Sequence, residues 1–134
     1  VIFTGFRSDI PQLMAASDIY SMPSFEEPFG MVFLEAMAMK KPVIALNNGG
    51  SREIVEHGLT GLLSAPQDID QLASNIRTLV ENPGLRRKMG ECGRKKVEER
   101  FTPTHMSAEV LKIYQSKLFP EFYRDSAYYR KDVL

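Results

Sequence analysis

Pro23-Ser-Phe-Glu-Glu-Pro-Phe-Gly-Met-Val-Phe-Leu-Glu-Ala-Met-Ala is the stretch of sequence that decides the fold, and it occupies residues 23–38. The pattern predicts the end of a strand, then a polar loop, then a helix that opens after Gly30. That helix is apolar except for Glu35, and a carboxylate among apolar residues is costly unless something pairs with it. A second carboxylate, Glu27, stands just ahead of the helix.

The two carboxylates flank a helix N-terminus. Seven residues separate Glu27 from Glu35, and eight steps at helical rise span roughly 12 Å. The free amides and positive dipole end of the helix favour an anion such as a diphosphate. The stretch therefore offers an acceptor, an anion site and another acceptor, which matches the sugar hydroxyls, diphosphate and ribose hydroxyls of a nucleotide sugar.

Three further motifs follow this stretch in order. Glu27-Pro-Phe-Gly with Glu35 is followed by Pro42-Val-Ile-Ala, by Gly49-Gly and by Glu53-Ile-Val. In this combination the chain resembles the retaining nucleotide-sugar glycosyltransferases of GT-B architecture that carry a Glu-x7-Glu motif, the glycosyl transferases group 1 family. The resemblance covers roughly residues 1–118.

The resemblance implies a role for each site residue. Glu27 would bind a hydroxyl of the donor sugar and serve as the catalytic carboxylate, and Glu35 would accept both ribose hydroxyls, as a carboxylate can. The residues expected to bind the rest of the donor are Phe29, Gly30, Met31 and Val32 through their backbone amides, and Phe6 and Arg7 near the nucleobase. The donor would be a UDP-sugar or a GDP-sugar, and neither a metal nor another cofactor is expected.

The resemblance also implies a larger enzyme. This chain would be the incomplete C-terminal donor-binding domain of a hexosyltransferase that retains anomeric configuration, and it would be inactive alone. The missing N-terminal part would supply the site for a glycan, lipid or small-molecule acceptor and any peripheral association with a membrane. The expected location is cytoplasmic, at the inner face of the membrane where the acceptor is a lipid.

Composition agrees with an ordinary globular domain. The 134 residues are 43% hydrophobic and 25% charged, which is typical of such domains. Seventeen basic residues balance seventeen acidic ones, so nothing indicates a nucleic-acid partner. The single cysteine excludes an internal disulfide and suits a reducing compartment.

Alternating strand and helix patterns predict an α/β, Rossmann-like fold with a parallel sheet flanked by helices. Strands are expected at residues 1–4, 18–23, 42–46 and 60–65, and helices at 10–16, 31–39, 51–56, 68–82, 84–101 and 103–119. The donor-binding domain is assigned to residues 1–118 and a tail to 119–134. In the usual strand order 3-2-1-4-5-6 the strand at residues 1–4 would lie at the far edge, with its neighbours outside this sequence. We therefore expect it to pair unusually or with another chain.

Other interpretations stay open from the sequence. A nucleotide-sugar epimerase shares this architecture, a Rossmann-like binding module would need no catalysis, and a glycosidase would need its two carboxyl groups about 5–10 Å apart. Residues 47–50 are expected to form either a plain turn or a loop facing the acceptor. Lys40 stands where the family usually has the glycine that ends the central helix.

Overall fold

A computed structural model describes residues 1–118 and shows a three-stranded parallel sheet. Its strands are β1 (Tyr20–Met22), β2 (Val43–Leu46) and β3 (Gly61–Ser64), in the order β1-β2-β3. Tyr20 pairs with Val43, and Val43 with Gly61. The predicted α/β fold with a parallel sheet is therefore confirmed.

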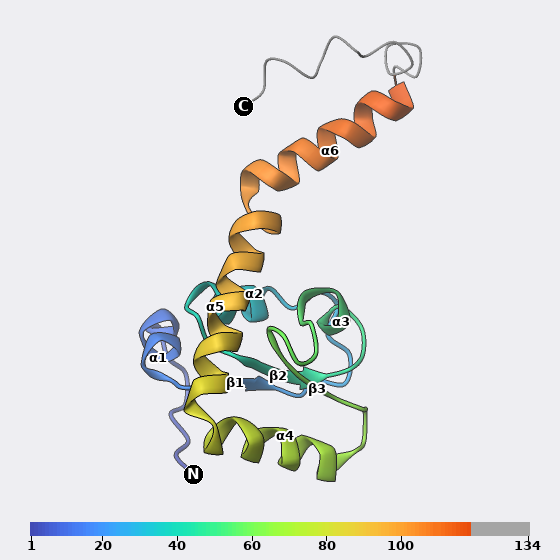
Figure 1. Cartoon of the computed structure of the whole chain (residues 1–134). Coiled ribbons are helices and arrows are strands. Elements are labelled where there is room, and N and C mark those ends of the chain that lie inside the picture. The colour runs from blue at the N-terminus through green and yellow to red at the C-terminus, as the bar shows by residue number, and fades with distance from the viewer. Residues whose placement is uncertain (119–134) are drawn as a thin grey trace. The chain divides into compact units, whose positions relative to one another are not determined.

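Six helices accompany the sheet within the described part of the chain. They are α1 (Ile10–Ala16), α2 (Met31–Ala38), α3 (Ser51–Ile54), α4 (Ile69–Glu81), α5 (Pro83–Arg100) and α6 (Pro103–Leu118). The chain divides into two compact units, Val1–Glu98 and a second that begins at Glu99. The sheet lies in the first unit, with α4 on one face and α2 and α3 on the other (Figure 1).

The central strand, β2, holds the core together because all four of its residues are buried. On the face covered by α4, Ile44 clusters with Leu62, Leu79 and Met89. Phe33 of α2 is also fully buried. A strand that is buried on both faces reads as a continuous apolar run, which is why residues 42–46 were recognisable in the sequence.

The predicted strand at residues 1–4 is wrong as an element of this structure. Residues 1–4 form no strand, and Val1, Ile2 and Phe3 are almost fully exposed. The reason is the sheet order: the sheet described here holds only β1, β2 and β3, and the strand at residues 1–4 was expected in third position of the usual order, where β1 would stand fourth. A strand in third position would be separated from β1 by two strands, so it has no neighbour here to pair with.

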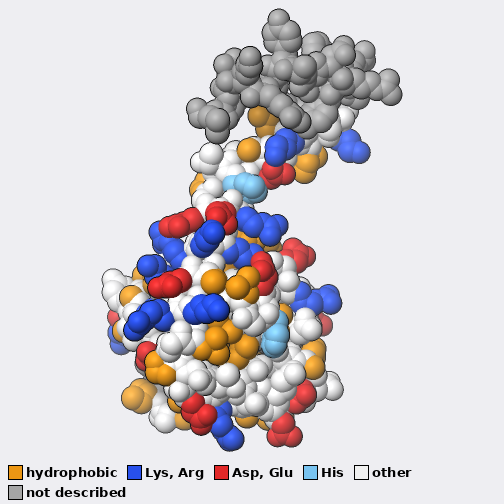
Figure 2. All heavy atoms as spheres, in the orientation of Figure 1, with side chains coloured by type: hydrophobic (Ala, Val, Ile, Leu, Met, Phe, Trp, Pro, Cys, Tyr) orange, Lys and Arg blue, Asp and Glu red, His pale blue; other side chains and the backbone are white. Residues whose placement is uncertain are grey.

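Basic side chains cap the C-termini of four helices. Lys41 donates to Ala15 O of α1 (2.7 Å), Arg94 to Ala38 O of α2 (2.6 Å), Lys96 to Ile54 O of α3 (2.8 Å) and Arg86 to Leu79 O of α4 (2.7 Å). Such cations satisfy carbonyls left free at the helix end and oppose its negative dipole. Three of the four come from α5, over which acidic and basic side chains are interspersed (Figure 2).

Helix α2 ends in a left-handed turn at Lys40, which has φ +58°. The Lys40 amide donates to Met37 O (2.9 Å) and the Lys41 amide to Ala36 O (2.9 Å). This pair of bonds is the Schellman motif, whose left-handed position is normally glycine. The turn is therefore kept here with a residue that is strained in it.

Replacing Lys40 by glycine is expected to stabilise the protein by about 0.5–1 kcal/mol, because glycine adopts positive φ without steric strain. Chemical denaturation of Lys40→Gly and Lys40→Ala measures the change in the free energy of unfolding. Alanine is the control because it removes the same side chain but keeps the backbone strain. Equal stability of the two variants would contradict this explanation.

Candidate functional site

Two loops meet at the carboxyl ends of neighbouring parallel strands. Residues 23–30 connect β1 to α2, and residues 47–50 connect β2 to α3. In open α/β sheets ligands bind outside these strand ends. The central sequence motif therefore lies where the fold places a ligand.

Gly30 makes the sharp entry into α2. It is buried and has φ +96°, and a Cβ atom there would overlap the ring of Phe33. No side chain caps the helix, and its first turn holds no acidic residue. The amides of Met31 and Val32 therefore stand at a free helix N-terminus, which attracts anions.

Glu27 comes just before this N-terminus along the chain and Glu35 is the fifth residue of α2, and neither is held by a structural partner. The exposed Glu35 carboxylate makes no hydrogen bond or ion pair within residues 1–118, and neither does that of Glu27. Both charges reach the partly buried Tyr20. The pKa of the Tyr20 hydroxyl is raised, most of all by burial and then by the negative charges of Glu35 and Glu27. Both carboxylates therefore act on one region beside α2.

The loop at residues 47–50 supports the loop that carries Glu27. The Gly50 amide donates to the Glu27 carbonyl at 2.9 Å. A Cβ on Gly49 would overlap that carbonyl, and one on Gly50 would overlap the Phe29 backbone. Only glycine at positions 49 and 50 lets this loop approach the backbone of the Glu27 loop so closely. The contact helps to hold the Glu27 loop in place.

No hydrogen bond or ion pair within the described residues brings Phe6 or Arg7 to this place. Phe6 is almost fully exposed, and Arg7 forms an ion pair with Asp9 two residues on. The pair raises the pKa of Arg7 and lowers that of Asp9. Their expected contact with a nucleobase stays a prediction.

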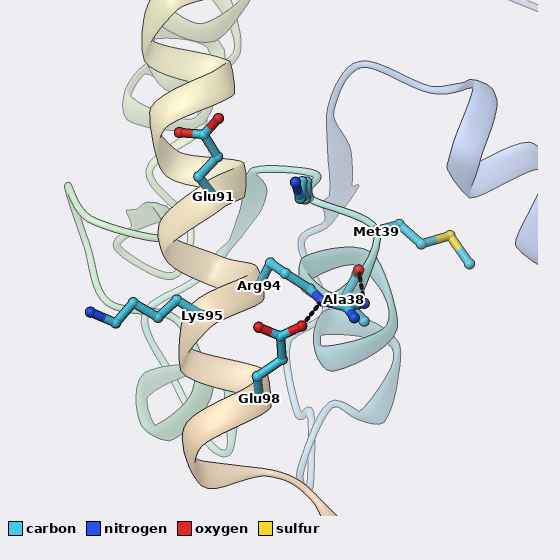
Figure 3. Close-up of a pocket in the computed structure, with 7 residues that line it drawn as sticks. Ala38, Met39, Glu91, Arg94, Lys95 and Glu98 are labelled. Atoms are coloured by element: carbon cyan, nitrogen blue, oxygen red, sulfur yellow. Dashed lines mark hydrogen bonds and ion pairs between the residues drawn. The ribbon is translucent and has the colours of Figure 1, made fainter.

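A pocket of about 530 Å³ lies at the opposite end of α2, against α5. In Figure 3 the side chains of Arg94 and Glu98 point toward Ala38, and Glu91 also lines the pocket. The C-terminal end of a helix is negative, and Arg94 already binds Ala38 O and Glu98. Lys40 and Lys95 line the pocket as well, but the negative helix end makes it less suited to a diphosphate, so we favour the N-terminal end of α2.

No group of three His, Cys, Asp or Glu residues within residues 1–118 could hold a metal ion. Within the same residues no helix is long and apolar enough to cross a membrane.

Comparison with known proteins identifies the family. The sequence model described as "Glycosyl transferases group 1" matches residues 1–96. The chain belongs to this family. The chain is similar to the N-acetyl-alpha-D-glucosaminyl L-malate synthase of Bacillus anthracis, with 36% identity over 118 residues, covering 88% of this chain and 31% of that protein.

A second relative is human alpha-1,3/1,6-mannosyltransferase ALG2, to which the chain is 36% identical over 112 residues, covering 84% of this chain and 26% of that protein. Among solved structures, Anabaena HepE in complex with UDP and glucose is 38% identical with a TM-score of 0.78, covering 87% of this chain and 32% of that one. The chain thus spans about a third of the length of the relatives it matches. The α/β fold expected from the GT-B resemblance is confirmed.

Nothing in the sequence pointed to Tyr20, and Asn48 was expected only as part of a turn or an acceptor-facing loop at residues 47–50. Tyr20 packs edge-on against Phe33, with ring centroids 6.3 Å apart, and Asn48 binds the carbonyls of Ser24 and Phe25. A usable signal existed for Asn48, since asparagine in a glycine-rich loop often binds backbone groups. None existed for Tyr20, whose aromatic ring in a strand is ordinary.

Proposed function

We propose that this chain binds the nucleotide-sugar donor of a glycosyltransferase that transfers a hexose to a glycan, lipid or small-molecule acceptor. The observation that carries the proposal is the pair of carboxylates, Glu27 and Glu35, without structural partners before and after an uncapped helix N-terminus along the chain. The family match and the UDP bound to the related HepE support it.

Each part of the site would take one part of the donor. The amides of Phe29, Gly30, Met31 and Val32 would bind the diphosphate, where a helix N-terminus stabilises the charge that develops on the leaving group. Glu35 would accept both ribose hydroxyls. Glu27 would accept a hydroxyl of the sugar and hold it for transfer, which is its catalytic role. No metal is needed in this scheme.

The rest of the proposed reaction needs groups outside this chain. We propose transfer with retention of configuration, in which the acceptor attacks on the leaving-group side, and we place the acceptor site in a preceding domain. The chain alone would then bind donor without transferring sugar. We also propose a cytoplasmic location, at the inner face of the membrane for a lipid acceptor. UDP is the preferred nucleotide of the donor, with GDP second.

Replacing Glu27 by alanine is expected to weaken binding of UDP-glucose about tenfold, the size of one charge-assisted hydrogen bond, while binding of UDP stays unchanged. The two ligands should differ in this way because Glu27 would contact only the sugar, which UDP lacks. Titrations by NMR, which reach millimolar Kd, measure both ligands, with GDP and ADP as further nucleotides.

Glu26→Ala is the matched control, since Glu26 is the exposed neighbour in the same loop. Equal loss of UDP and UDP-glucose in Glu27→Ala would contradict the sugar contact. An epimerase, the main alternative, would convert the sugar nucleotide without any acceptor, which chromatography of the incubated donor detects. A pure binding module would bind nucleotides with no dependence on Glu35.

A further inference from the structure

We infer that Asn48 is a positioning residue for donor binding: it clamps the loop at residues 23–28 so that Glu27 stays beside the N-terminus of α2. The inference rests on the proposed function, because it takes the Glu27 loop as the sugar-binding loop. Asn48 itself would touch neither sugar nor nucleotide.

The clamp consists of one side chain reaching two carbonyls. The Asn48 amide nitrogen lies 2.5 Å from Phe25 O and 3.3 Å from Ser24 O. These partners are more than 20 residues away along the chain, just ahead of Glu27. A loop without helix or strand bonds depends on such contacts to hold one conformation.

One atom of the Asn48 side chain is in an unfavourable environment, and this supports its role as a clamp. The side-chain oxygen of Asn48 is buried and has no hydrogen-bond partner in the described residues. A buried polar atom left unpaired costs free energy and needs an explanation. If the side-chain amide were rotated by 180°, its oxygen would face the two carbonyls and could donate to neither. The observed orientation therefore keeps the two hydrogen bonds to the loop and leaves the side-chain oxygen unpaired.

The clamp acts together with the neighbouring backbone. The Gly50 amide holds the Glu27 carbonyl, and the Ser24 amide bonds Met22 O at 3.0 Å. Hydrogen exchange at these two amides therefore reports whether the loop at residues 23–28 is held in this conformation. Because a shift of about 1 Å in a positioning group can cost on the order of 100-fold in reactivity, fixing this loop matters even though Asn48 is remote from the ligand.

The test compares Asn48→Leu with Asn75→Leu in the whole chain. Asn75 is a matched control because its amide also binds a strand-end carbonyl, Leu63 O at 3.2 Å, but from α4. Asn48→Leu is expected to speed hydrogen exchange of the Ser24 and Gly50 amides about tenfold, equivalent to about 1.4 kcal/mol, and to raise the Kd of UDP-glucose more than that of UDP. Asn75→Leu is expected to do neither at a similar melting temperature.

Each outcome decides the inference. Unchanged exchange at Ser24 and Gly50 would overturn it, as would faster exchange with unaltered UDP-glucose affinity. If Asn48→Leu does not fold, Asn48→Ala takes its place, and a mere loss of stability equal to that of Asn75→Leu would also overturn it. Failure of the unmodified chain to bind any nucleotide sugar would instead overturn the proposed function, and the inference with it.

Discussion

Replacing Gly90 by valine is expected to destabilise the protein by about 3 kcal/mol or more, the upper range for forcing a side chain into a packed site. Gly90 lies in α5 at the point where this helix crosses the end of α2. A Cβ atom there would overlap the carbonyl oxygen of Lys40, which is backbone and cannot swing aside. Either α5 moves off the sheet or the Schellman turn at Lys40 breaks.

The measurement is thermal unfolding, where a loss of this size lowers the midpoint by about 10 °C or more. Gly84→Val is the matched control, because Gly84 lies in the same helix with open space around it. There the change should be within about 1 kcal/mol, since valine is a slightly better helix former than glycine. A Gly90→Val protein as stable as Gly84→Val would contradict the packing of α5 on α2.

Replacing Glu35 by glutamine is expected to weaken UDP binding about 10- to 100-fold. The reason is the loss of a charge-assisted pair of hydrogen bonds to the ribose, worth about 1.5–3 kcal/mol. Because the Glu35 carboxylate is exposed and has no partner within residues 1–118, the melting temperature should stay the same. Loss of binding without loss of stability separates a ligand contact from a structural salt bridge.

Glu91→Gln is the control for this variant. Glu91 is an exposed glutamate on a helix of the same unit, and it lines the pocket at the other end of α2 (Figure 3). UDP affinity should not change in Glu91→Gln. If Glu91→Gln weakens UDP binding and Glu35→Gln does not, the nucleotide occupies the pocket and our assignment of the site is wrong.

The local elements were predictable because each carries its own signal. Helix α1 occupies the predicted residues 10–16, with Pro11 in its first turn. Helix α4 begins at Ile69, one residue after the predicted start, and Asp68 caps it by accepting from the Gln71 amide at 2.8 Å. Short apolar runs between such helices predicted β2 and β3 to within a residue or two. Local capping and periodicity decide these features, so no tertiary information was needed.

Features that depend on distant partners were not predictable. The sequence 1–4 has the composition of a buried strand, yet it forms none because composition does not supply a neighbouring strand. Gly90 reads only as a residue that weakens its helix, and its need for space against Lys40 appears only once α5 is packed. The clamp of Asn48 on Phe25 likewise joins two loops that the sheet brings together.

The most direct test of the central claim is a map of amide chemical shifts during titration with UDP-glucose. Our account predicts that the largest changes fall on Gly30, Met31 and Val32, with further changes around Glu27 and Glu35, and that GDP-sugars shift the same amides less. Changes concentrated at Ala38, Met39 and α5, or no change at millimolar ligand, would contradict a donor site at the N-terminus of α2.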